Sequence, residues 1–404
     1  MANILKKDVD ALRNRLLLVN ARNITAGHDL VESAFRAYLS EQGRAHTYID
    51  IRNLPETRWA SATLAAKKAV SDLAMRDETL SHILTNYDRP HLPIKISLDE
   101  NGQFLRSIRG EDAIVCFHSD AWTALSKQYR NVVGVLTDLY GYHKEQLDPR
   151  LYALCVPTTW LASRIRRENP WIADWERAHG RQYLRVVGLP LHPLVEKKVE
   201  ADNLRRKRAL MPAQEKNEPI HVLVKSGGAG TNSEEILKIL KDFAPDIKAG
   251  RIRLHIHAGA YQPLAKKIES SVKKLGLSGC KFLSIAKYGT IAEAVKAYPK
   301  AAAWADVLVS KPSEQLMNSR AGIPVLMLEP RGWGKHEPNN AYWAKNMGIA
   351  DFFAQENMSY RERFWRLHNE GKLLRMHERA ASTYSGPSAC GKIMDVANEV
   401  ARIR

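Results

Sequence analysis

The chain has 404 residues, of which 45% are hydrophobic and 26% are charged, and this composition excludes a disordered or fibrous protein. No stretch approaches the roughly 18 uninterrupted apolar residues of a membrane-spanning helix, and the first residues lack the apolar core of a signal peptide. The length is typical of about two or three domains. The formal net charge of +17 indicates an anionic partner (nucleic acid, lipid headgroups or a phosphorylated substrate) or a surface charge that serves solubility alone.

The four cysteines are scattered and form no Cys-x-x-Cys pair. Cys116 and Cys155 lie in apolar runs, where we expect them to be small core residues. A reduced, cytoplasmic setting is therefore expected.

Short apolar runs alternate with helix-like stretches through the first half of the chain. The runs expected to be strands are RLLLVNA (15–21), HTYIDI (46–51), DAIVCFH (112–118), NVVGVLTD (131–138), LYALCVP (151–157) and YLRVVGLP (183–190). A stretch between two of them, residues 28–43, is typical of a helix that ends at a glycine. This alternation predicts a parallel sheet with helices on both faces.

The pattern lapses over residues 196–218 and then resumes. The later runs expected to be strands are IHVLVKS (220–226), IRLHIHAG (252–259), CKFLSIA (280–286), ADVLVSK (305–311) and IPVLMLEP (323–330). We therefore expect an α/β protein with two Rossmann-like, doubly wound domains that face each other across a cleft. The expected boundaries are 1–195 for the first domain, 196–218 for a linker with a basic helical piece, 219–385 for the second domain, and 386–404 for a C-terminal helix that could pack back on the first domain.

The sequence LVKSGGAGTNSEE (223–235) places a glycine-rich turn between an expected strand and an expected helix. Gly227, Gly228 and Gly230 would let backbone N–H groups approach an anion closely, and the helix N-terminus adds a partial positive charge. Thr231 and Glu234 fit a T-x-x-E capping box. The turn is neither a G-x-G-x-x-G nor a Walker motif, so a tight turn without a ligand is the alternative.

The segment 301–353 carries a resemblance to a known donor domain. It contains AWADVLVS, a polar turn, a helix-like stretch, AGIPVLML, a loop that ends in HEPNNA, and MGIA. In this order the motifs resemble those of GT-B glycosyltransferases of the group that contains monogalactosyldiacylglycerol synthase and the cell-wall lipid II-forming N-acetylglucosaminyltransferase. The first half is similar to the same group in its TAGHD turn, its VLTD strand end and its later GLP.

The resemblance implies a binding site for a nucleotide-diphosphate sugar in the second domain. The diphosphate would lie over Gly227, Gly228, Ala229, Gly230 and Thr231, the ribose near Ser313 and Glu314, and the sugar hydroxyls near His336, Glu337 and Asn340. Two positions depart from the family pattern. The position of the family's ribose carboxylate is Met317, with Glu314 about one turn upstream, and the family's first sugar-binding Gln is replaced by His336.

His28 and Asp138 are the candidate catalytic residues. His28 follows an expected strand at the start of an expected helix, and a histidine has a suitable pKa to take the proton of an acceptor hydroxyl. Asp138 ends an apolar strand and could orient His28 or bind an acceptor hydroxyl. The alternative for both residues is a role in capping or packing.

We expect no metal and no cofactor besides the nucleotide-sugar co-substrate. His255 and His257 share one face of a strand, but no third ligand accompanies them at a diagnostic spacing. Trp171 and Trp175 lie among arginines, which suits a membrane or nucleic-acid surface, although two tryptophans at i and i+4 more often face a core.

The resemblance implies an inverting, metal-independent glycosyltransferase that uses a UDP-sugar and a lipid acceptor at the cytoplasmic face of the membrane. The net charge of +17 fits peripheral attachment to anionic lipid. Three alternatives remain open: a transferase that glycosylates nucleic acid, a nucleotide-sugar 2-epimerase, and a catalytically silent nucleotide-binding relative. The oligomeric state does not follow from the sequence.

Overall fold

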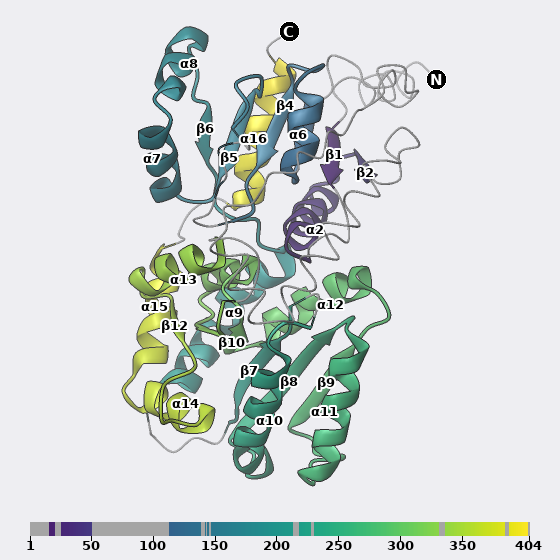
Figure 1. The fold of residues 1–404 in the computed structure, drawn as a ribbon, viewed down its shortest axis with the longest axis vertical. Helices are drawn as coiled ribbons and strands as arrows, with labels where there is room; N and C mark the ends of the chain where they lie inside the picture. Colours follow the sequence, from purple (N-terminus) through teal and green to yellow (C-terminus); the bar gives the residue numbers. More distant parts are fainter. Residues whose placement is uncertain are drawn as a thin grey trace. The chain divides into compact units, whose positions relative to one another are not determined.

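The computed structural model describes residues 16–20, 26–50, 113–138, 142, 144, 147–212, 218–227, 230–330, 336–383 and 388–402. They fall into two compact units, coloured by sequence in Figure 1, and the chain passes from one to the other between Pro190 and Leu191. Residues 388–402 belong to the first unit. No helix among the described residues is both long enough and apolar enough to cross a bilayer.

The described part of the first unit contains a parallel sheet of six strands in the order β2-β1-β3-β4-β5-β6. Its elements are β1 (Leu16–Asn20), α2 (Ala26–Glu41), β2 (His46–Asp50), β3 (Ala113–Cys116), α6 (Ser119–Leu125), β4 (Val132–Val135), β5 (Ala153–Val156), α7 (Thr159–Glu168), α8 (Trp171–His179), β6 (Leu184–Val186) and α16 (Ala389–Arg402). Helix α16 packs against β3 and α2, so the end of the chain completes the unit in which the chain begins.

The four inner strands of the first unit, β1, β3, β4 and β5, are buried on both faces. In β1, Leu16 and Leu18 pack in one cluster with side chains of α2 and α16, whereas Leu17 and Val19 pack in another with side chains of α6, α7 and α8. Successive side chains of a strand point to opposite faces, which explains why these strands appear in the sequence as unbroken apolar runs. Cys116 and Cys155 lie in these clusters as expected, and burial raises the pKa of both thiols.

Trp175 lies in the core of the first unit, and the partly buried Trp171 packs against that core. Both rings pack edge-on against Tyr183, with ring centroids 5.3 Å and 5.2 Å away, and Trp175 Nε1 donates to Pro149 O at 2.7 Å. The interpretation of this pair as core-facing is confirmed.

The described part of the second unit contains a parallel sheet in the order β12-β11-β10-β7-β8-β9. Its elements are α9 (Pro193–Leu210), β7 (Ile220–Lys225), α10 (Ser233–Lys248), β8 (Ile252–Gly259), α11 (Gln262–Lys274), β9 (Leu283–Lys287), α12 (Ile291–Trp304), β10 (Val307–Ser310), the 3₁₀ helix η4 (Glu314–Ala321), β11 (Val325–Met327), α13 (His336–Asn346), β12 (Ala350–Phe352), α14 (Tyr360–Asn369) and α15 (Lys372–Thr383). Two parallel sheets flanked by helices confirm the predicted α/β fold class, and each run expected to be a strand overlaps one.

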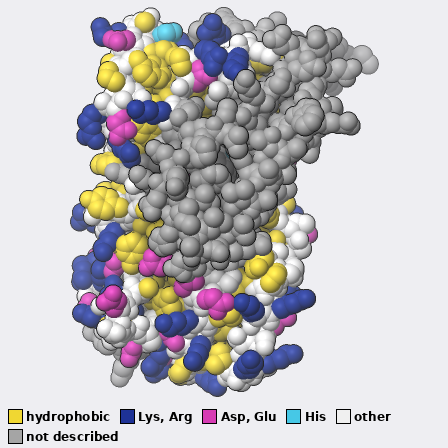
Figure 2. Space-filling model, viewed as in Figure 1, with side chains coloured by type: hydrophobic (Ala, Val, Ile, Leu, Met, Phe, Trp, Pro, Cys, Tyr) yellow, Lys and Arg dark blue, Asp and Glu magenta, His cyan; other side chains and the backbone are white. Residues whose placement is uncertain are grey.

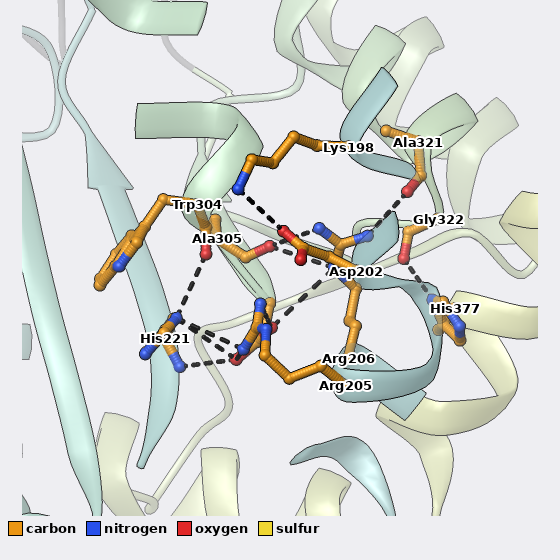
Figure 3. A network of polar contacts seen from close by, with 11 residues as sticks. Lys198, Asp202, Arg205, Arg206, His221, Trp304, Ala305, Ala321, Gly322 and His377 are labelled. Carbon is orange, nitrogen blue, oxygen red and sulfur yellow. Dashed lines mark hydrogen bonds and ion pairs between the residues drawn. The ribbon is translucent and has the colours of Figure 1, made fainter. Parts of the chain in front are cut away.

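Helix α9 occupies most of the stretch expected to be a linker, and it packs on α12, η4 and α15 within the second unit. Two of its basic residues, Arg205 and Arg206, point into a polar network (Figure 3), in which Arg206 is buried and Arg205 half-buried. Arg205 donates to both carboxylate oxygens of Asp306, at 2.7 Å and 3.1 Å. Arg206 is 1% exposed and donates to Ala305 O and Ala321 O. The basic cluster NLRRKRA therefore has a structural use in addition to its charge.

Asp306 is the centre of this network. Its carboxylate is fully buried, lies 4.0 Å from Arg206 Nε, and accepts a hydrogen bond from the backbone N–H of His221 at 2.9 Å. It therefore joins α9 to the beginnings of β7 and β10, at the edge of the sheet where the strands start.

Replacement of Asp306 by Ala is expected to lower the free energy of unfolding of the second unit by about 3–5 kcal/mol, because it leaves buried arginine charge without its partner. Urea denaturation measures this loss. The matched control is Glu378→Ala, since Glu378 also joins α15 to α9 through Lys207, but with both side chains about half exposed; it should cost less than about 1 kcal/mol. Equal losses for the two variants would contradict a central role for Asp306.

Candidate nucleotide-sugar site

The candidate site lies where the order of the second sheet changes direction. From β7 the chain winds outward through β8 to β9, and then returns to β10 on the other side of β7. The segments that leave the carboxyl ends of β7 and β10 therefore diverge, and ligands of open α/β sheets bind in such a crevice. The glycine-rich turn follows β7 at this point, and Lys311 follows β10.

The turn after β7 has no room for side chains at two of its glycines. Gly230 has φ +77°, and an added Cβ would come within 2.0 Å of Tyr261 Cδ1. An added Cβ at Gly227 would lie 2.7 Å from Thr231 Oγ1 and 3.5 Å from Lys311 Cε. Ser226 fastens the start of the turn by donating to Ala258 O at 2.8 Å. Gly228 and Ala229 lie outside the described residues.

The predicted capping box is wrong. Helix α10 begins at Ser233, and its N-cap is Asn232, which has φ +63° and makes no side-chain cap. Asn232 Nδ2 donates instead to Glu235 Oε1 at 3.1 Å and to Glu329 O at 3.2 Å, while Glu234 pairs with Lys267 at the surface. The chain thus enters α10 one residue later than the capping pattern requires.

The correction changes the role of Thr231. Its side chain is 1% exposed, and among the described residues its hydroxyl has no hydrogen-bond partner. Ser313, at the beginning of η4, is 3% exposed and its hydroxyl likewise lacks a partner within the described part of the chain. A buried hydroxyl without a partner costs about 1–3 kcal/mol, so both positions favour a polar ligand or water.

Lys311 is a site residue that the sequence did not single out. It is 9% exposed and forms an ion pair with Glu337, the second residue of α13, which is 1% exposed. The sequence contains one signal for it, since a lysine that directly follows an apolar strand at the carboxyl edge must either reach solvent or find an anion.

The remaining donor-site candidates lie in η4 and α13, which follow the carboxyl ends of β10 and β11. Asn340 is fully buried in α13, close in sequence to Glu337. His336 and Glu314 begin α13 and η4, but their side chains, like that of Met317, lie outside what the structure describes.

His257 lies beside the start of the glycine turn, in β8, where it pairs with Lys225 of β7. Its Nε2 is 3.2 Å from Ala294 O, and its Nδ1 has no partner among the described residues. Burial, and then the charge of Lys225, lower its pKa to about 3. The ring is therefore neutral at physiological pH. His255, two residues earlier, contacts Ser284 Oγ at 2.7 Å; no three His, Cys, Asp or Glu side chains within the described ranges are grouped to hold a metal.

The two catalytic candidates both lie in the first unit. His28 is the third residue of α2, which follows β1, and its side chain is not among those described. The neighbouring Asp29 accepts a hydrogen bond from Asn20, the last residue of β1, at 3.1 Å. Asp138 is partly buried and lies three residues beyond β4. His28 and Asp138 thus follow strands at the carboxyl edge of the first sheet, which is the edge that binds ligands in such folds.

Known proteins resemble this chain in fold more than in sequence. A family model described as "Domain of unknown function (DUF6938)" matches residues 182–297. No curated protein matches the chain significantly. Solved structures that match nearly the whole chain include MurG from Acinetobacter baumannii, with 16% identity and a TM-score of 0.53 over 96% of this chain and 99% of that one.

Two further structures share the fold. UDP-GlcNAc 2-epimerase from Neisseria meningitidis, bound to UDP-GlcNAc, has 11% identity and a TM-score of 0.53 over 96% of this chain and 100% of that one. MnaA from S. aureus, in a co-structure with UDP, has 10% identity and a TM-score of 0.52 over 97% and 98%. At such identities the likeness establishes the fold, which is the two-sheet α/β fold of GT-B glycosyltransferases.

Replacement of Gly230 by Ala is expected to destabilise the second unit by about 1–3 kcal/mol more than Gly279→Ala, because only the first change forces a methyl group into an aromatic ring. Gly279 is a matched control, since its φ is +72° and an added Cβ would meet nothing within 4 Å; its substitution carries only the left-handed backbone strain of about 1–2 kcal/mol. Thermal or urea unfolding distinguishes the two. Equal losses would show that the turn can open at Gly230.

Proposed function

We propose that the chain is a glycosyltransferase that takes its sugar from a nucleotide-diphosphate sugar, specifically a UDP-sugar. The observation that carries the proposal is the pair of buried hydroxyls without a described partner, on Thr231 and Ser313, at the switch point of the second sheet. A diphosphate over the glycine turn and a ribose beside η4 would supply these hydroxyls with acceptors and donors.

In the proposed complex the diphosphate lies over Gly227–Thr231 and receives backbone N–H groups of the turn. The N-terminus of α10 adds about half a positive charge. The ribose lies near Ser313 and Glu314. The sugar hydroxyls lie near His336, Glu337 and Asn340, where carboxylate and amide oxygens accept hydrogen bonds from them.

In the proposed reaction, His28 takes the proton of the acceptor hydroxyl, and Asp138 orients His28 or the acceptor. The acceptor oxygen attacks the anomeric carbon in line with the departing diphosphate, which inverts the configuration at that carbon. The electron pair of the broken bond goes to the diphosphate oxygen, where the turn stabilises the developing charge without a metal.

The acceptor that we propose is a lipid-borne hydroxyl at the cytoplasmic membrane face. The net charge of +17 supports attraction to anionic lipid. Figure 2 shows Lys and Arg side chains scattered over the visible described surface, with Asp and Glu side chains among them. The charge therefore favours a general attraction to an anionic surface, and an acceptor assay must distinguish lipid from nucleic acid.

Replacement of Gly227 by Ala is expected to weaken UDP binding on the order of 10–10²-fold, because the added methyl group would clash with Thr231 and force the turn, over which the diphosphate would lie, out of its conformation. Isothermal titration with UDP measures the loss. Gly279→Ala is the control and should bind UDP like the unmodified chain. Unchanged affinity in Gly227→Ala would remove the turn from the binding site.

Replacement of His28 by Ala is expected to reduce the transfer rate on the order of 10²–10⁴-fold, while UDP affinity is unchanged, because the acceptor hydroxyl loses its base. The assay follows labelled sugar from UDP-sugars into lipid extracts of vesicles that contain diacylglycerol and anionic phospholipid, and in parallel into DNA and RNA. An unchanged rate would exclude His28 as the base.

A 2-epimerase is the second candidate, because a UDP-GlcNAc 2-epimerase matches this fold with the same TM-score of 0.53 as MurG. An epimerase needs no acceptor. Conversion of the sugar when the donor is incubated alone would therefore favour it, whereas label that appears only in an added acceptor would favour the transferase.

A further inference from the structure

Lys311 and Glu337 form a buried ion pair at one end of the glycine turn. Lys311 is 9% exposed and Glu337 is 1% exposed, and 26 residues separate them in the sequence. Two charges removed from water repay their desolvation only with excellent geometry and further hydrogen bonds, and an apolar pair of similar volume is often at least as stable. The stability of the fold therefore gives no reason for an ion pair at this place.

The location of the pair suggests its use. Lys311 Cε lies 3.5 Å from the point that a Cβ of Gly227 would occupy, so the lysine stem lies against the turn itself. The buried hydroxyls of Thr231 and Ser313 belong to the same two strand ends. An anion that accepted hydrogen bonds from the turn and from Thr231 would lie within the reach of an ammonium group at Lys311.

We propose that Lys311 is the cation that neutralises the donor's diphosphate, and that Glu337 holds it in place before the donor arrives. This inference rests on the proposed function and names the residue that stabilises the leaving group there. An ammonium has three donors and a carboxylate has about four acceptor positions. Lys311 can therefore turn one N–H toward the β-phosphate while it keeps Glu337, and Glu337 can accept a hydroxyl of the sugar in addition to Lys311.

This arrangement places the lysine at the bond that breaks. When the bond between the anomeric carbon and the β-phosphate oxygen breaks, its electron pair remains on that oxygen, and the acceptor's proton goes to His28. Lys311 would meet the charge gained by the β-phosphate, which is the role that a divalent metal has in other phosphate-binding sites. Glu337 would contact both the lysine and the sugar, so attachment of the sugar would change the contacts of the pair.

The double variant Lys311→Met with Glu337→Gln tests the proposal without leaving a buried charge unpaired. Titrations with UDP and with UMP separate the β-phosphate from the rest of the nucleotide. The unmodified chain should prefer UDP; in the double variant UDP affinity should fall on the order of 10–10²-fold, while UMP affinity changes less than about threefold. Melting curves establish that the variants are folded.

Two single variants serve as controls. Glu337→Gln keeps the lysine and should keep the preference for UDP, and Lys311→Arg keeps the charge and should retain most of it. An unchanged preference in the double variant would overturn the role of Lys311 and leave the proposed function standing. If the unmodified chain bound neither UDP nor inorganic pyrophosphate, both the role of Lys311 and the proposed function would be overturned.

Discussion

Strand β7 is hydrogen-bonded to β10 on one side and to β8 on the other, and this parallel pairing determines which residues meet at the glycine turn. A strand paired on both sides must leave the sheet at its carboxyl end through a turn that its neighbours crowd. Tyr261 fills the space beside Gly230, and Thr231 lies against Gly227. The backbone of the turn is therefore held close to the strand ends, where its N–H groups can be presented to an anion.

Buried charged groups lie at both ends of the strands of this sheet, with different consequences. At the amino edge, Asp306 is satisfied by arginines of α9 and by a backbone N–H, and this closed network fastens α9 to the sheet. At the carboxyl edge, Lys311 and Glu337 also pair, but beside two buried hydroxyls that no described residue satisfies. A closed network explains stability, whereas an incomplete one indicates a ligand.

The strands were predictable from the sequence because a sheet covered on both faces requires unbroken apolar runs, as in Leu16–Asn20. The three residues of β12 were not expected as a strand, since so short a run carries no periodic signal. The capping box at Thr231 failed because a left-handed Asn232 delays the helix, and a local pattern cannot show this conformation. The glycine turn was found from its order between strand and helix. Lys311 was missed, because its importance depends on a partner 26 residues away in the sequence.

Binding of a nucleoside diphosphate in the crevice between β7 and β10 is the central proposal. Thermal unfolding of the purified chain with UDP-, GDP-, ADP-, dTDP- and CMP-sugars and their free nucleotides tests it most directly. A ligand at 100 times its dissociation constant stabilises a fold by about 2.7 kcal/mol. We expect a selective rise in melting temperature with UDP and UDP-sugars. No rise with any member of the panel would contradict it and leave only the fold.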